Sequence, residues 1–255
     1  MILGINTSTV RLGVALFDGE SVVASATFVR ANAHDELLAP LCRDLVARAG
    51  MAMDDLDAVA VSAGPGSFTG LRIGMAAAKG FALALNLPLV AVPTHDAAAE
   101  SVARRWPLTA AFSRATPIPL AVCIDARRDE LYLARYTMSH EEEHGWRSVE
   151  EIRVAELDAV PGLLAPGTLL AGDGAVKVSA AMRASAAASG AGLDGDISAG
   201  GSTVLPDPAS VFDAGAVARL GARLLAQRGP DDAASCEPLY VQEFLVKQAK
   251  NPFLS

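Results

Sequence analysis

The stretch "LGINTSTVRLGVALFD", residues 3–18, has the pattern of a β-hairpin: an apolar strand, a polar turn and a second apolar strand. The stretch "VCIDARRDELYLARYT", residues 122–137, aligns with it without a gap and has the same pattern. In this alignment Asn6 falls on Asp125. A unit that recurs within one chain indicates a structure built from similar parts. The repeat therefore predicts two lobes, each of which begins with a β-hairpin.

Two hairpin-led lobes predict an α/β protein with the two-lobed actin/hexokinase-like ATPase (ribonuclease H-like) fold. In that fold the first turn of each lobe faces a nucleotide phosphate, often with an aspartate that organises hydrated Mg²⁺. The first turn here carries Asn6, Thr7 and Ser8. A neutral amide is a poorer ligand for a divalent cation than a carboxylate. We expect these three residues to be vestigial nucleotide contacts, which argues against a self-sufficient ATPase.

The second lobe offers further candidates for vestigial nucleotide contacts. Asp125 and Arg127 fall in its first turn, and Gly172 and Gly174 follow the predicted strand in "GTLLAGDGA". Similar glycines flank the adenosine in the ATPase fold, but a turn capped by Asp and a plain strand-to-helix turn explain these residues equally well.

Between and after the hairpins, apolar spacing predicts alternating helices and strands. The predicted elements are a helix over 34–49, a strand over 56–64, a helix over 68–85, a strand over 87–94, and helices over 95–105, 175–189 and 211–227. Prolines at 107, 117 and 119 indicate a linker. We expect an N-terminal lobe over 1–106 and a C-terminal lobe over 107–255, with the helix at 211–227 a candidate to pack back on the first lobe.

Composition narrows the class of function. The chain has 255 residues, 51% of them hydrophobic, and a net charge of −8. It repels nucleic acid on average, so an RNA role needs a partner protein or a local basic patch. Cys42, Cys123 and Cys236 are odd in number and far apart, which is typical of reduced thiols in a cytoplasmic protein. We expect no signal peptide and no membrane span.

The glycine-rich stretch "GPGSFTGLRIGMAAAKG", residues 64–80, resembles a phosphate-binding loop but fits neither known pattern. A P-loop requires G-x-x-x-x-G-K-[ST], and a dinucleotide-binding turn requires G-x-G-x-x-G. Counted from Gly64, the required glycine falls in both patterns at Thr69. Ser67 suits the N-cap of a helix that follows. The glycines therefore need another explanation.

Four motifs, taken in order, resemble the bacterial TsaB (YeaZ) family: "INTSTVRLGVALFD", "SAGPGSFTGLRIGMAAAKGFA", "IDARRDELYLARY" and "EPLYV". The likeness runs over nearly the whole chain and is densest at 62–82. It implies a non-catalytic partner in making N6-threonylcarbamoyladenosine at position 37 of tRNAs that read A-starting codons. The implied partners are TsaD, a paralogue that transfers the threonylcarbamoyl group, and the ATPase TsaE. tRNA would be reached through the complex only, with ATP or ADP bound there rather than to the isolated chain, which is a monomer or a homodimer.

The resemblance also implies a docking surface, because the first two helices of each subunit form the TsaB–TsaD joint. Gly66, Gly70 and Gly74 are spaced by four, so they share one helix face, and small residues allow a second helix to approach closely. Packing inside the lobe is the competing explanation. The predicted docking residues are His34, Leu38, Leu41, Leu45, Gly66, Gly70, Arg72, Gly74, Ala77 and Ala78.

Metal chemistry is not expected. TsaD holds its metal with two histidines four apart, and the matching positions here are Thr94 and Ala98, with His95 offset by one near the helix start. The segment "HEEEH" at 140–144 matches the zinc-protease signature. It lacks a third ligand and an apolar residue to bury, so we interpret it as an exposed turn between strands. A metallopeptidase and a phosphotransferase of the same fold are the alternative functions.

Overall fold

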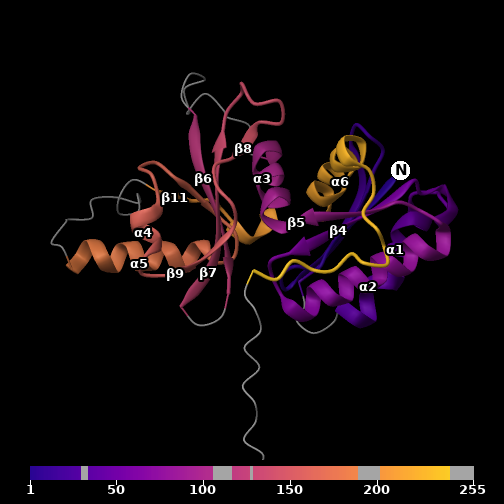
Figure 1. The fold of residues 1–255 in the computed structure, drawn as a ribbon, viewed down its shortest axis with the longest axis horizontal. Coiled ribbons are helices and arrows are strands. Elements are labelled where there is room, and N and C mark those ends of the chain that lie inside the picture. Colours follow the sequence, from indigo (N-terminus) through magenta and orange to yellow (C-terminus); the bar gives the residue numbers. More distant parts are fainter. Residues whose placement is uncertain (30–33, 106–116, 127–128, 189–201, 242–255) are drawn as a thin grey trace, which may run out of the picture.

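The computed structural model describes residues 1–29, 34–105, 117–126, 129–188 and 202–241. Two mixed sheets form two lobes that lie side by side, with helices on their faces (Figure 1). Each lobe begins with the predicted hairpin: β1 pairs antiparallel with β2, and β6 with β7. The two-lobed α/β fold predicted from the repeat is confirmed. The predicted boundary at 106/107 lies outside the described residues.

The first sheet has the strand order β3-β2-β1-β4-β5. Its strands are β1 (Ile2–Asn6), β2 (Arg11–Phe17), β3 (Val22–Val29), β4 (Ala58–Gly64) and β5 (Leu89–Pro93). Strands β1, β2 and β3 are antiparallel neighbours, whereas β1, β4 and β5 run parallel. All seven residues of β4 are buried, because parallel strands are covered on both faces.

Helices cover both faces of this sheet. The helices are α1 (His34–Arg48), α2 (Phe68–Leu85), α3 (Thr94–Arg105) and α6 (Ala214–Arg228). Helices α1 and α2 pack on one face, and α6 packs on the other against β1, β2, β4 and β5 (Figure 1). Ser67 is the N-cap of α2, and its side chain accepts a hydrogen bond from the Gly70 N–H. Asn86, in the left-handed conformation, is the C-cap. The predicted N-cap is confirmed.

The second sheet has the strand order β11-β10-β6-β7-β8, and β9 also pairs with β7. Its elements are β6 (Ile118–Asp125), β7 (Glu130–Met138), β8 (Trp146–Ser148), β9 (Arg153–Glu156), α4 (Val160–Leu163), β10 (Leu169–Ala171), α5 (Ala175–Ala188) and β11 (Thr203–Val204). One buried apolar cluster joins this sheet to α5, and another joins it to α3. Helix α3 therefore contributes to both lobes.

A buried carboxylate ties the lobes together at α3. Glu100 is 1% exposed and accepts hydrogen bonds from Trp146 Nε1 of β8 at 2.9 Å and from Arg223 of α6 at 3.2 Å. A second link joins Arg11 of β2 to both carboxylate oxygens of Asp207, each at 3.1 Å. The Glu100 contacts fix α3 between the lobes, because a buried charge is stable only with its partners in place, whereas the Arg11–Asp207 pair is exposed.

The chain after α6 returns across the first lobe as an extended segment, residues 229–241, which we call the strap (Figure 1). Asp231 bonds to the backbone of β5 through Leu89 and Ala91. Further on, the Leu239 N–H donates to the carbonyl of Ala63 in β4 at 2.7 Å. The described part of the first lobe therefore comprises residues from both ends of the chain.

Candidate functional site

The turn between β1 and β2 in the first lobe is closed. Asn6, Thr7 and Ser8 are each at most 1% exposed. The Asn6 Oδ1 accepts hydrogen bonds from the Ser8 N–H at 3.0 Å and from the Ser8 hydroxyl at 2.7 Å. The Thr7 N–H donates to Ser62 Oγ at 3.2 Å. Asn6 thus stabilises its own turn, as Asn side chains commonly do, and its oxygen is occupied.

The N-terminus of α2 packs directly against this turn. A Cβ atom added at Gly70 or Gly74 would overlap Thr7, and one added at Gly66 would overlap the Ser8 carbonyl. The Ser67 N–H also donates to the Ser8 carbonyl at 2.6 Å. The glycines therefore allow α2 to lie directly on the turn. The interpretation of Gly66, Gly70 and Gly74 as a surface for a partner helix is wrong, because these residues pack inside their own lobe.

Most other predicted docking residues also face the core. His34, Leu38, Leu45 and Ala78 are buried, Leu41 and Ala77 are half-buried, and Arg72 is exposed. The His34 Nε2 bonds to the Thr9 carbonyl at 3.1 Å. Apolar periodicity marks the face that packs on the sheet, so the prediction selected the inner sides of the correct helices. The buried members are corrected as core residues, whereas Leu41, Arg72 and Ala77 keep surface that a partner can contact.

A second row of small residues lies on the outer side of α2. Ala76, Gly80 and Ala84 are exposed at a spacing of four, and Leu83 beside them is 71% exposed. A Cβ atom at Gly80 would meet nothing within 4 Å. We call Arg72, Ala76, Gly80, Leu83 and Ala84 the outer row.

The composition of α2 reflects this exposed apolar row. Among the described residues, α2 is the one helix long and apolar enough to cross a membrane. A core helix of a folded lobe meets the same criterion, so this is weak evidence for a span. About a third of the helix, 33%, is buried, and Ala76, Leu83 and Ala84 are apolar residues among those it exposes.

The outer row is bordered by α1 and by the strap. The Arg72 guanidinium lies 3.7 Å from the centroid of the Phe68 ring, and its Nε donates to the Tyr240 hydroxyl at 3.0 Å. The Lys79 ammonium bonds to the Ala234 carbonyl of the strap at 3.4 Å. The strap therefore holds the edge of this surface in place.

The corresponding turn of the second lobe is more open. Asp125 ends β6, and its side chain is 36% exposed and pairs with Lys177 Nζ at 2.6 Å. Its N–H donates to Asp173 Oδ1 at 2.9 Å. Burial raises the pKa of Asp173, and the nearby charge of Asp125 raises it further. Arg127, the other candidate in this turn, lies outside the described residues.

Gly172 and Gly174 bring the start of α5 against this turn. The Gly174 N–H donates to the Cys123 carbonyl at 3.0 Å, and a Cβ atom at Gly174 would lie 2.6 Å from Leu131 Cδ2. The structure thus brings Asp125, Gly172 and Gly174 together. Sequence analysis missed Asp173 and Lys177 beside them, although "GDGAVK" at 172–177 places a carboxylate between two glycines and an amine one turn later.

The two histidine motifs do not form a metal site. Residues 139–145 connect the antiparallel strands β7 and β8, so "HEEEH" is the predicted turn and not a helix. The His144 Nε2 lies 3.7 Å from a carboxylate oxygen of its neighbour Glu143. No group of three or more His, Cys, Asp or Glu side chains within the described ranges is arranged to hold a metal ion.

His95 lies at the start of α3, as predicted, and is fully buried. Its Nε2 donates to the Tyr132 carbonyl at 3.0 Å, and its Nδ1 has no hydrogen-bond partner among the described residues. Burial lowers the pKa of His95 to about 4, although the bond to Tyr132 opposes the shift. The hydroxyl of the neighbouring Thr94 accepts a hydrogen bond from the Gly64 N–H at 3.1 Å.

These features define a class: a two-lobed α/β protein of the actin-like ATPase fold whose first turn is closed by its own helix. A family model described as TsaD, tRNA N6-adenosine threonylcarbamoyltransferase, matches residues 26–201. A solved structure described as YeaZ from Pseudomonas aeruginosa is 25% identical, with a TM-score of 0.69, over 94% of this chain and 98% of that chain. The chain belongs to the TsaB (YeaZ) family, which is related to TsaD.

Curated relatives agree with this assignment. The tRNA threonylcarbamoyladenosine biosynthesis protein TsaB of Escherichia coli is 36% identical over 135 residues, covering 53% of this chain and 54% of the relative. TsaB of Bacillus subtilis is 34% identical over 136 residues, with 53% and 54% covered. The chain thus spans about half the length of these relatives. An uncharacterized protein of Mycobacterium tuberculosis is 36% identical over 163 residues, 63% of this chain and 68% of the relative.

Proposed function

We propose that this chain is a non-catalytic subunit that acts with TsaD and TsaE to form N6-threonylcarbamoyladenosine at position 37 of tRNAs that read A-starting codons. The observation that carries the proposal is the closed first turn. The Asn6 oxygen is used within the turn, and α2 fills the space above Thr7. A phosphate and its metal ion need open space and oxygen ligands at this position. A partner that completes an active enzyme does not.

The same observation opposes a phosphotransferase of this fold. Asp125, a candidate contact in the second lobe, pairs with Lys177 at 2.6 Å, so its charge is neutralised within the chain. A metallopeptidase needs its two histidines on one rigid helix face, whereas "HEEEH" forms a turn. These observations support the partner role over either rival.

The outer row is the surface that suits a partner. It presents small residues on which a second helix can lie closely, and Leu83 projects as an apolar anchor. We assign this surface to a helix of TsaD, since the family resemblance places the joint on the first two helices. The net charge of −8 supports a protein partner over direct tRNA binding. ATP or ADP would then bind in the complex, and tRNA would be reached through TsaD.

Reconstitution tests this proposal. Purified TsaD and TsaE are incubated with tRNA transcript, ATP and threonylcarbamoyl precursors, with or without the chain, and modified adenosine is quantified. We expect product only with the chain present, and no ATP hydrolysis by the chain alone. Leu83→Glu should abolish binding to TsaD and product formation together, because it places a charge in an apolar joint.

Val176→Glu is the matched control for Leu83→Glu. Val176 is also an exposed aliphatic residue on a helix, 56% exposed, but lies on α5 of the second lobe. It should bind TsaD and support modification like the wild-type chain. Equal product with and without the chain would refute the partner role. Normal TsaD binding by a folded Leu83→Glu variant would refute the assigned surface.

A further inference from the structure

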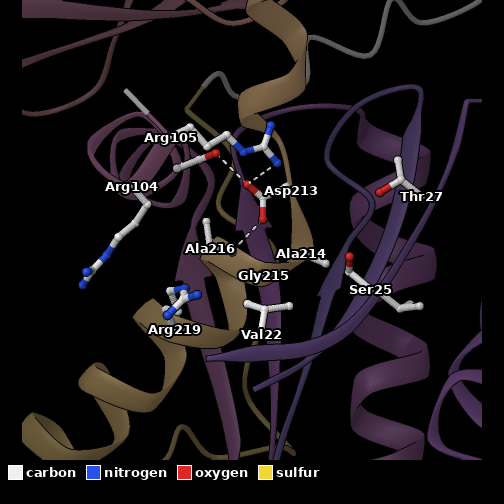
Figure 2. Close-up of a pocket in the computed structure, with 12 residues that line it drawn as sticks. Val22, Ser25, Thr27, Arg104, Arg105, Asp213, Ala214, Gly215, Ala216 and Arg219 are labelled. Atoms are coloured by element: carbon white, nitrogen blue, oxygen red, sulfur yellow. Dashed lines mark hydrogen bonds and ion pairs between the residues drawn. The ribbon is translucent and has the colours of Figure 1, made fainter. Parts of the chain in front are cut away.

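A pocket of about 250 Å³ lies apart from both hairpin turns (Figure 2). Four elements form it: β2, β3, the last turns of α3, and the first turns of α6. Ser25 and Thr27 line one wall, and Arg104, Arg105 and Arg219 line the others. In Figure 2 the two hydroxyl-bearing side chains lie across the pocket from Arg104 and Arg219. The pocket thus combines cations on one side with hydroxyl groups on the other.

Both carboxylate oxygens of Asp213, which lines this pocket, already accept hydrogen bonds from the chain. Its Oδ1 accepts the Ala216 N–H at 2.8 Å, and its Oδ2 accepts the Ser101 hydroxyl at 2.6 Å and Arg105 at 3.0 Å. Asp213 and Arg105 therefore neutralise each other. The N-terminus of α6 is capped internally, so the attraction for an anion depends on the remaining arginines.

Arg219 supplies a positive charge that no carboxylate neutralises within ion-pair distance among the described residues. Its NH1 donates to the Glu20 carbonyl at 3.1 Å, and its guanidinium lies 5.0 Å from the centroid of the Phe17 ring. Both contacts hold the side chain in place without cancelling its charge. A fixed, uncompensated guanidinium is the group that proteins use to bind phosphate.

Arg104 is a second cation at the pocket, and its Nε is the atom that it uses in an ion pair. Its Nε pairs with Glu100 at 3.1 Å, and the same carboxylate also pairs with Arg223 at 3.2 Å. Glu100 thus shares its charge between Arg104, which lines the pocket, and Arg223, which also interacts with Asp96. The charge of Arg104 is therefore only partly neutralised.

We infer that this pocket binds a ribose phosphate unit, with the phosphate on Arg104 and Arg219 and the sugar toward Ser25 and Thr27. The volume of about 250 Å³ equals that of about eight water molecules, which is more space than a phosphate alone requires. We assign the unit to a free sugar phosphate, because the net charge of −8 opposes direct RNA binding, and the test distinguishes this source from an RNA backbone. The inference stands apart from the proposed partner function, which depends on the outer row of α2.

Calorimetric titration of the purified chain tests the inference with three probes: ribose 5-phosphate, ribose, and an unmodified tRNA transcript. We expect saturable binding of ribose 5-phosphate that weakens with added salt, and no binding of ribose. Arg219→Gln and Arg104→Gln should each weaken binding about tenfold or more, because each removes a charge-assisted contact. Arg43→Gln, at an exposed position on α1, is the control and should bind as the wild type does.

The three probes distinguish the two sources of the phosphate. Binding of the transcript alone, lost in Arg219→Gln, would assign the pocket to an RNA backbone, whereas binding of ribose 5-phosphate would assign it to a small molecule. Melting curves check that each variant is folded, and Arg104→Gln replaces Arg219→Gln if the latter unfolds. No saturable binding of either phosphate probe, or equal binding by the pocket variants and Arg43→Gln, would overturn the inference.

Discussion

The inner and outer faces of α2 carry similar residues and have opposite surroundings. On the inner face, Gly70 and Gly74 lie against Thr7 with no room for a methyl group. On the outer face, a Cβ atom added at Gly80 would have nothing within 4 Å, and Ala76 is exposed. Small residues at a spacing of four therefore serve two purposes on one helix. The inner row lets α2 close the Thr7 turn, and the outer row stays exposed, where we propose that a partner helix docks.

The largest effect is expected from a bulky charge on the inner face. Gly74→Arg would drive a side chain into Thr7 and bury an unpaired guanidinium, so we expect the first lobe to fail to fold, at a cost above about 4 kcal/mol. Circular dichroism melting and solubility measure this. Gly74→Ala should fold but melt earlier, because overpacking of about 1–3 kcal/mol exceeds the gain in helix propensity. A wild-type melting curve for Gly74→Arg would mean that the inner face is not packed.

The same substitution on the outer face should separate binding from stability. Gly80→Arg has open space around it and raises helix propensity, so we expect a melting temperature at or slightly above the wild-type value. Its affinity for TsaD should fall about a hundredfold, because the long side chain holds the partner helix away. Surface plasmon resonance measures the affinity, with Gly80→Ala as the control that keeps the surface small. Tight TsaD binding by Gly80→Arg would place the joint elsewhere.

A smaller effect is expected from His95, buried where α3 joins the lobes. Its pKa in the folded chain is about 4, against an ordinary value of 6.5. Between these values the unfolded chain binds the proton and the folded chain does not, so stability falls as pH drops from 6.5 to 4. The loss approaches roughly 3 kcal/mol. His95→Gln keeps a donor for the Tyr132 carbonyl. Between pH 6.5 and pH 4, its free energy of unfolding, measured by urea unfolding, should fall less than that of the wild type. Parallel pH profiles would contradict this.

The smallest effect is expected where the strap borders the outer row. Tyr240 contacts Phe68 with ring centroids 5.4 Å apart and bonds to Arg72. Tyr240→Ala should cost about 1 kcal/mol locally and leave the inner face unchanged. Hydrogen exchange should show faster exchange at the Leu239 amide, which bonds to Ala63, with an unchanged rate at Ser67. Faster exchange at both amides would show that the two faces of α2 are coupled.

The sequence was sufficient for the architecture because the hairpin repeat and the helix periods are local patterns. It was insufficient for the orientation of α2, because the rows through Gly70 and Gly80 have the same spacing and similar side chains. Only the position of the Thr7 turn decides which row is buried. The pairing of Asp173 and Lys177 with Asp125 likewise depends on where α5 begins relative to β6.

The arginine pocket could not have been predicted from a motif. Its walls come from β2, β3, α3 and α6, which meet only because α6 returns to the first sheet. Arg104 and Arg105 in sequence are typical of an ordinary helix C-terminus, where basic residues are favoured by the helix dipole. The carboxylate partners that decide whether each arginine keeps its charge are likewise distant in the chain.

The return of α6 and the strap to the first sheet has a consequence for synthesis. Domains commonly fold from the N-terminus as the ribosome releases them, at about 5–20 residues per second. Here the face of β1, β2, β4 and β5 stays uncovered until Ala214–Arg228 has been made. The first lobe is therefore synthesised before the second lobe but is completed after it, when α6 has been made. For several seconds its apolar sheet face is available to chaperones, and a chain that stops before Ala214 would retain this exposure.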